Sequence, residues 1–126
     1  MAPQELPPAA FLRPVTLSKR SDFTRVARAH HVAMPGFILQ MRRRRVGEAE
    51  GTRVGFTCSK KVGNAVARNR AKRRLRELAW QVLPVLGRDG VDYVLIGRRG
   101  ATADLPFAQL KVDLISALNR LNGRLT

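Results

Sequence analysis

The amino-acid sequence predicts a single α+β domain, in which a sheet of three or four strands packs with three helices. Two stretches alternate apolar and polar residues as strands do, and a third is short and almost continuously apolar. Three longer stretches place apolar residues at the three- and four-residue spacing of a helix. The order is helix, strand, strand, helix, strand, helix, and 126 residues suit one domain.

The first half of the chain predicts a helix and a hairpin. Residues 17–29 have helical spacing, and a serine near their start can cap the helix. Residues 30–34 predict a connection or a short strand. Strands are predicted over 36–44 and 53–60, joined by a loop with two glycines. Within each predicted element the apolar residues share one face, and these residues are Phe23, Val26 and Ala27 in the helix, Phe37, Leu39 and Met41 in the first strand, and Val54, Phe56 and Cys58 in the second.

The second half predicts a helix, a strand and a final helix. Residues 64–83 form the longest helical pattern, which Pro84 should end. Residues 91–96 read VDYVLI, a short apolar run typical of a buried strand. Asp104 should cap the last helix, with a proline in its first turn and Gly123 just beyond its end. The strand–helix–strand order around the long helix predicts a parallel crossover.

Residues 1–16 are rich in proline and predict a disordered segment ahead of a domain at 17–126. They lack the pattern of a secretory signal, and no apolar run approaches the roughly 20 residues of a membrane span. The single cysteine, Cys58, leaves no internal disulfide and suits a reducing cytoplasm. One cysteine and two adjacent histidines give no metal-ligand spacing. We therefore expect a cytoplasmic protein with no membrane partner and no metal of its own.

The charge balance is the strongest functional signal in the composition. Lysine and arginine total 24 against 9 aspartate and glutamate residues, a formal net charge of +15. The isoelectric point is near 11.8. Such a field attracts polyanions, and with a membrane disfavoured, nucleic acid is the expected partner.

Much of this charge lies in one stretch. Between Lys60 and Arg76 there are eight lysines and arginines and no acidic residue. Helical spacing puts the apolar residues of the long helix on a narrow face and the basic ones on a broad adjoining face. The apolar face consists of Ala67, Ala71, Leu75, Leu78 and Val82, and the polar face consists of Arg68, Asn69, Lys72, Arg73 and Arg76, flanked by Arg70 and Arg74.

This basic face has two interpretations, because charge runs are usually plain solvated surface. Here, however, like charges such as Arg68 and Lys72 stand four residues apart, which costs about 0.2–0.5 kcal/mol per pair. Phosphate groups would supply the missing counter-charge, and arginine matches phosphate geometry in a bidentate way. We therefore favour a polyanion-binding surface, although composition leaves both RNA and DNA open.

The segment RVGFTCSKKVGNAVARNRAKRRLRE, at residues 53–77, resembles the bacterial ribonuclease P protein component. The hallmark of that family is a lysine pair, a Gly-Asn-Ala-Val step, an Arg-Asn-Arg step and a basic helix. A looser resemblance runs from about Leu17 to the C-terminal helix. It implies a ribosomal S5 domain 2-like fold, whose strand–helix–strand crossover is left-handed instead of the usual right-handed kind. The hallmark steps stand at 60–61, 63–66, 68–70 and 72–73.

The resemblance implies a protein that assists a catalytic RNA. In the family, a large RNA subunit uses Mg²⁺ to cleave the 5′ leader from precursor tRNA, and the protein binds both that RNA and the leader. It implies no catalytic side chain and no cofactor bound by the protein itself. The residues implied to bind the RNA subunit are Asn64, Arg68, Asn69, Arg70, Lys72, Arg73 and Arg76. Those implied for a leader cleft between the first helix and the sheet are Phe23, Lys60, Lys61 and Arg68.

Some residues keep two interpretations. Phe23 can stack on a leader base or pack in the core. Ala27 and Gln40 stand where relatives often carry aromatic residues, which predicts a cleft poor in stacking. The arginine run at 42–45 can contact RNA or lie at a solvated hairpin tip. Trp80 is expected to be partly buried against the sheet.

Two other functions are compatible with parts of this pattern. A ribosomal-type RNA-binding protein would share the charge and the α+β layout, but the motif at 60–76 argues against it. A metal-dependent nuclease would need paired carboxylates, whereas the nine acidic residues are scattered along the chain. The sequence therefore predicts the protein subunit of ribonuclease P, with catalysis by its RNA.

Overall fold

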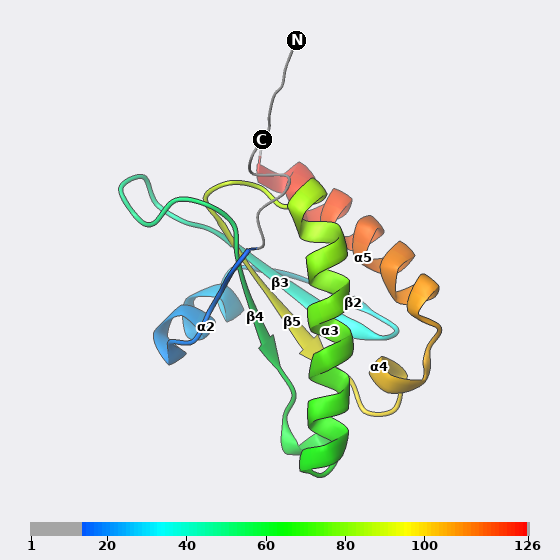
Figure 1. Cartoon of the computed structure of the whole chain (residues 1–126). Coiled ribbons are helices and arrows are strands. Elements are labelled where there is room, and N and C mark those ends of the chain that lie inside the picture. Colours follow the sequence, from blue (N-terminus) through cyan, green and yellow to red (C-terminus); the bar gives the residue numbers. More distant parts are fainter. Residues whose placement is uncertain (1–13, 126) are drawn as a thin grey trace.

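The computed structural model describes residues 14–125, so the expectation for residues 1–13 lies outside the described part of the chain. This part is an α+β domain, in which three consecutive strands follow the first helix and a long helix precedes the last strand (Figure 1). The elements are β1 (Val15–Thr16), α2 (Arg20–Ala27), β2 (His30–Met34), β3 (Phe37–Arg43), β4 (Arg53–Thr57), a 3₁₀ turn (Lys60–Val62), α3 (Ala65–Leu86), β5 (Val91–Gly97), α4 (Ala101–Asp104), α5 (Phe107–Asn122) and a second 3₁₀ turn (Gly123–Leu125).

The five strands form one mixed sheet in the order β1-β4-β5-β3-β2. β4 pairs with β1 and β5 in parallel, whereas β3 pairs with β5 and β2 in antiparallel fashion. The sequence predicts three or four strands, and the short edge strands β1 and β2 bring the number to five. Val15 and Thr16 therefore belong to the sheet and not to the segment ahead of the domain.

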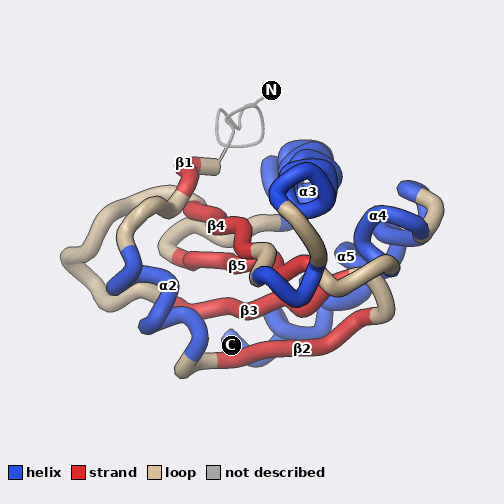
Figure 2. The backbone as a smooth tube through the Cα atoms, turned by 90° about the horizontal axis from the view of Figure 1, so that it is seen from below, coloured by secondary structure: helices blue, strands red, loops and turns tan. Residues whose placement is uncertain are grey.

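Helices cover both faces of the sheet. Figure 2 shows α2 on one face and α3 and α5 on the other. α3 connects the parallel strands β4 and β5, and the path from β4 through α3 to β5 turns in the left-handed sense (Figures 1 and 2). The left-handed crossover implied by the family resemblance is confirmed.

The larger of two apolar clusters lies between the sheet and the helices α3 and α5. Phe37, Leu39 and Met41 of β3 point into it as predicted, and so do Leu75 and Leu78 of α3. A smaller cluster lies on the opposite face, beneath α2. The sheet is therefore covered on both sides, but only the α3 side holds a large core.

The long helix does not end before Pro84 as predicted but continues to Leu86. Pro84 stands near the C-terminal end of α3, where a missing backbone N–H weakens only the last turn. Leu86 is half-buried and packs against the larger cluster, and its carbonyl accepts a hydrogen bond from the side chain of Asn122 at 3.0 Å, which favours the extra turn. The N–H of Gly87 closes the helix by donating to the carbonyl of Leu83 at 2.8 Å.

Two other helix boundaries also differ from the prediction. α2 starts three residues later, because the N–H of Leu17 still continues the β1 pairing and donates to the carbonyl of Val54 at 2.8 Å. Lys19 stands at the N-cap of α2, so neither nearby serine caps it. Asp104 is the last residue of the short helix α4 and does not cap the final helix, which begins only after Pro106.

Leu75→Ala should lower the free energy of unfolding by about 2–5 kcal/mol, because Leu75 is fully buried between α3 and the sheet. Urea unfolding measures this loss. Val66→Ala is the matched control on the same helix, since Val66 is exposed, and should change stability by less than about 0.5 kcal/mol. A similar small change in both variants would show that the inward face of α3 is misassigned.

Candidate nucleic-acid interface

The start of α3 is fixed by side chains at its first turn. The Oδ1 atom of Asn64 accepts a hydrogen bond from the N–H of Ala67 at 2.9 Å and so caps the helix. Gly63 before it has a φ of 146°, which favours glycine. Arg68 donates to the carbonyl of Gly63 at 3.2 Å. Asn64, predicted as an RNA-binding residue, therefore also holds the helix start in place.

The basic surface of α3 is defined here by Arg68, Asn69, Arg70, Lys72, Arg73 and Arg76. Asn69, Arg70 and Arg73 are exposed, and the other three are half-buried at its edge. Within residues 14–125 no member of this surface forms an ion pair with a carboxylate. The repulsion between its like charges is therefore not offset within the described protein, and the surface remains available to a polyanion.

Arg74 lies on a different side of α3 and stabilises the fold. Its Nη1 atom donates to the carbonyls of Thr102 and Ala103, both at 2.7 Å. Its guanidinium lies 5.9 Å from the ring centroid of Phe107. These contacts tie α3 to α4 and to the start of α5. The basic stretch thus divides into an exposed surface and a structural contact.

A groove, called the α2 groove below, runs along α2 over the sheet. It has two parts of about 570 and 330 Å³, and Arg20, Phe23 and Thr57 line both. Cations, hydroxyl groups and two aromatic rings, those of Phe23 and Phe56, thus meet in a single groove, a combination suited to single-stranded nucleic acid. The other lining residues are Ser18, Phe56, Cys58, Ser59 and Lys72 in the larger part and Thr24, Ala27, Gln40 and Ile96 in the smaller part.

Phe23 is half-buried, so it packs in the core and also presents part of its ring to the groove. One side packs against Val26 and Val94 in the smaller cluster, and the other side lines the groove. Its ring sits directly on Gly55 of β4, where an added Cβ would lie 2.5 Å from a ring atom. Gly55 is a positioning residue that the sequence interpretation missed. A glycine inside an alternating strand is the signal that could have found it.

Of the four residues predicted for the leader cleft, only Phe23 lines the α2 groove. Lys72, which was predicted to bind the RNA subunit, lines the groove with it. Lys60 and Lys61 are exposed on the 3₁₀ turn that directly follows the groove residue Ser59. Arg68 is directed instead at the carbonyl of Gly63, at the start of α3.

Cys58 was predicted to be a buried core residue, but the structure shows it only half-buried. It packs against the larger cluster and also lines the α2 groove. Burial raises the pKa of its thiol above the ordinary value. The thiol therefore stays protonated at neutral pH and acts as a small apolar wall of the groove.

The arginine run at 42–45 is not simply a solvated hairpin tip. Arg44 is buried and pairs with the fully buried carboxylate of Asp92. It also donates to the carbonyls of Ala49, at 2.8 Å, and Gly51. These contacts close the loop between β3 and β4 and fix its base to the sheet. Spacing alone could not reveal this, because Asp92 lies 48 residues away in sequence.

Trp80 is half-buried, as predicted.

No helix within residues 14–125 is long and apolar enough to cross a membrane. In the same part of the chain, no three histidine, cysteine, aspartate or glutamate side chains are grouped as metal ligands.

The fold and its basic surfaces define a nucleic-acid-binding protein of the α+β class. The sequence profile of the family Ribonuclease P matches residues 11–122. The chain is 62% identical over 107 residues to the ribonuclease P protein component of Ruegeria pomeroyi, covering 85% of this chain and 86% of that protein. It is 50% identical over 115 residues to the component of Paramagnetospirillum magneticum, covering 85% and 82%.

Solved structures agree with these relatives. The Staphylococcus aureus RNase P protein has a TM-score of 0.66 and 31% identity, covering 84% of this chain and 94% of that one. The Thermotoga maritima RNase P protein, at 24% identity, shares the fold with a TM-score of 0.68 and coverage of 83% and 96%. This chain belongs to the ribonuclease P protein family. It is an RNA-binding component of that endoribonuclease, as the sequence predicts.

Asn64→Ala should lower the free energy of unfolding by about 0.5–2 kcal/mol, because it removes the cap of α3. Asn64→Ser keeps a capping oxygen and should stay close to the parent protein in the same urea titration. Equal losses in both variants would contradict the capping role. RNA affinity retained by the serine variant would show that Asn64 acts through the helix and not by contacting RNA.

Proposed function

We propose that the chain binds the RNA subunit of ribonuclease P through the basic surface of α3 and holds the 5′ leader of precursor tRNA in the α2 groove. The RNA subunit performs the cleavage with its Mg²⁺ ions, and this chain contributes binding without a catalytic side chain. The observation that supports this division is the position of Lys72, which belongs to the basic surface and also lines the groove beside Phe23.

The basic surface suits a folded RNA for electrostatic reasons. Its cations have no carboxylate partner within the described residues, so bound phosphates would relieve their mutual repulsion. Each phosphate contact would also release condensed counterions from the RNA. Arg70 and Arg73 are exposed and can present the planar fork that phosphate oxygens accept.

The α2 groove suits a single strand, because a leader presents both phosphates and unstacked bases. The ring of Phe23 packs directly on the backbone of Gly55, and it also lines the groove. Arg20 and Lys72 supply positive charge beside this ring. Ala27 and Gln40 line the groove where an aromatic residue would add stacking, so we place the contribution of stacking at the low end of its usual range.

We place this activity in the cytoplasm. The single cysteine requires no oxidising compartment, and its thiol is held protonated by burial. The net charge of +15 suits a compartment that contains abundant RNA.

Replacing Arg68, Lys72 and Arg73 together by glutamine should weaken binding to ribonuclease P RNA and reduce its salt dependence. Each lost phosphate contact should lower the slope of log K against log salt by about 0.7–0.9. The control replaces Lys111, Arg120 and Arg124 by glutamine, which removes the same charge from α5 and the turn after it. An equal slope in both variants would show that only net charge matters and that the basic surface of α3 is not the binding surface.

Phe23→Ala should weaken binding of the reconstituted holoenzyme to precursor tRNA roughly 5-fold, the lower end of a stacking loss of about 1–3 kcal/mol. Affinity for mature tRNA, which has no leader, should hardly change. Phe23→Leu retains apolar packing on Gly55 and separates stacking from loss of the core contact. Equal weakening for both tRNAs would return Phe23 to a purely structural role.

A further inference from the structure

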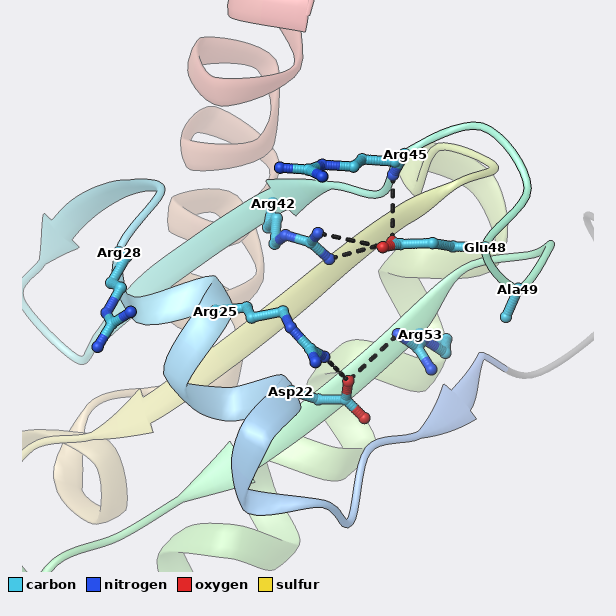
Figure 3. Close-up of a pocket in the computed structure, with 8 residues that line it drawn as sticks. All are labelled: Asp22, Arg25, Arg28, Arg42, Arg45, Glu48, Ala49 and Arg53. Atoms are coloured by element: carbon cyan, nitrogen blue, oxygen red, sulfur yellow. Dashed lines mark hydrogen bonds and ion pairs between the residues drawn. The ribbon is translucent and has the colours of Figure 1, made fainter.

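A second basic cavity lies on the α2 face of the sheet, apart from the groove. It measures about 740 Å³ and is called the arginine pocket here (Figure 3). We propose that the arginine pocket is a second RNA-binding site, which takes backbone phosphates on the opposite side of α2 from the groove. This inference rests on the proposed function, in which the groove holds the leader. The arginines that line the pocket are Arg25, Arg28, Arg42, Arg45 and Arg53.

The helix α2 separates the two sites. Phe23 and Ala27 line the groove, whereas Arg25 and Arg28 line the pocket. At about 100° per residue these pairs project from different sides of the helix. Strand register gives the pocket its floor, because Arg42, Asp92 and Arg53 stand side by side on β3, β5 and β4.

The carboxylates of the pocket hold arginines in place but do not neutralise them. Asp22 lies 3.0 Å from Arg25 and 3.7 Å from Arg53. Glu48 accepts hydrogen bonds from Arg42 at 3.3 and 3.4 Å (Figure 3). The hydrogen bonds from Arg42 lower the pKa of Glu48, so this carboxylate stays charged at neutral pH. The lining holds five guanidinium groups against two carboxylates, and even with Asp92, which pairs with Arg53 in the floor, the pocket keeps a net positive charge.

Two of the five arginines have a free guanidinium. Arg28 and Arg45 are exposed, and within residues 14–125 neither side chain has an ion-pair partner. Arg45 is positioned through its backbone N–H, which donates to Glu48 at 3.1 Å. The other three arginines are held by carboxylates beside these two free guanidinium groups. An anion could therefore bind with little reorganisation of the pocket.

The lining also selects the kind of anion. All but one of the side chains that line the pocket are charged, and none is aromatic. A base would find no ring to stack on, whereas phosphate oxygens would find several planar donors. The ligand chemistry is therefore the phosphodiester backbone, which either the RNA subunit or a tRNA substrate can provide.

The test replaces Arg28 and Arg45 by glutamine, because neither loss leaves a carboxylate without its partner. Arg120→Gln with Arg124→Gln removes the same charge elsewhere and is the matched control. Binding is measured against salt for three ligands: ribonuclease P RNA with the protein alone, and precursor and mature tRNA with the holoenzyme. Arg28→Lys with Arg45→Lys keeps the charge and should largely preserve the salt slope.

For at least one RNA, the glutamine variant should lower the log–log slope by about 1.4–1.8 and weaken binding roughly 25- to 60-fold near 0.1 M salt, relative to the control. A loss confined to the RNA subunit, to leader-bearing tRNA or to both tRNAs identifies the source of the phosphates. A glutamine variant that matches the control for all three RNAs would overturn the proposal. The variants of the α3 surface and of Phe23 report separately on the proposed function, so the two failures are distinguishable.

Discussion

The packing of α3 on the sheet is the constraint on which the rest of the structure depends. Leu75 and Leu78 are fully buried there, and each such side chain contributes about 1.5–3 kcal/mol. Each like-charge pair on the outer side of the helix costs only about 0.2–0.5 kcal/mol. Burial of the apolar face therefore outweighs the repulsion, and the helix can fold without RNA. The charges on its basic side then remain without counter-charges. The affinity for a polyanion follows from that imbalance.

The opposite face of the sheet is organised by a buried carboxylate. Asp92 on β5 accepts hydrogen bonds from Arg53 on β4 and pairs with Arg44, the residue directly after β3. Removing one partner of such a buried group typically costs about 3–5 kcal/mol, because a charge is left uncompensated. Arg44 in turn fixes the base of the following loop, and that loop supplies Arg45 and Glu48 to the arginine pocket. A structural ion pair thus shapes a functional surface.

Local patterns in the sequence predicted the features that depend on neighbouring residues. The inward positions of β3 and the apolar face of α3 followed from periodicity, and the family followed from the motif at 60–76. The two-residue edge strand β1 carries too little periodicity to be recognised, residues 30–34 proved to be the strand of the two alternatives offered for them, and the extra turn of α3 depends on the packing of Leu86. Contacts between distant residues were also missed, namely Asp92 with Arg44 and Gly55 with Phe23. Tertiary structure decides these, because no local pattern encodes the partner.

The most direct measurement is cleavage of a leader-bearing precursor tRNA by ribonuclease P RNA at low Mg²⁺, with and without this chain. If the chain binds the RNA subunit and the leader, adding it should raise kcat/KM for this substrate, and the gain should shrink as salt screens the phosphates. The chain alone should leave the precursor intact under the same conditions. An unchanged rate with the chain present, or cleavage by the chain without the RNA, would contradict the account.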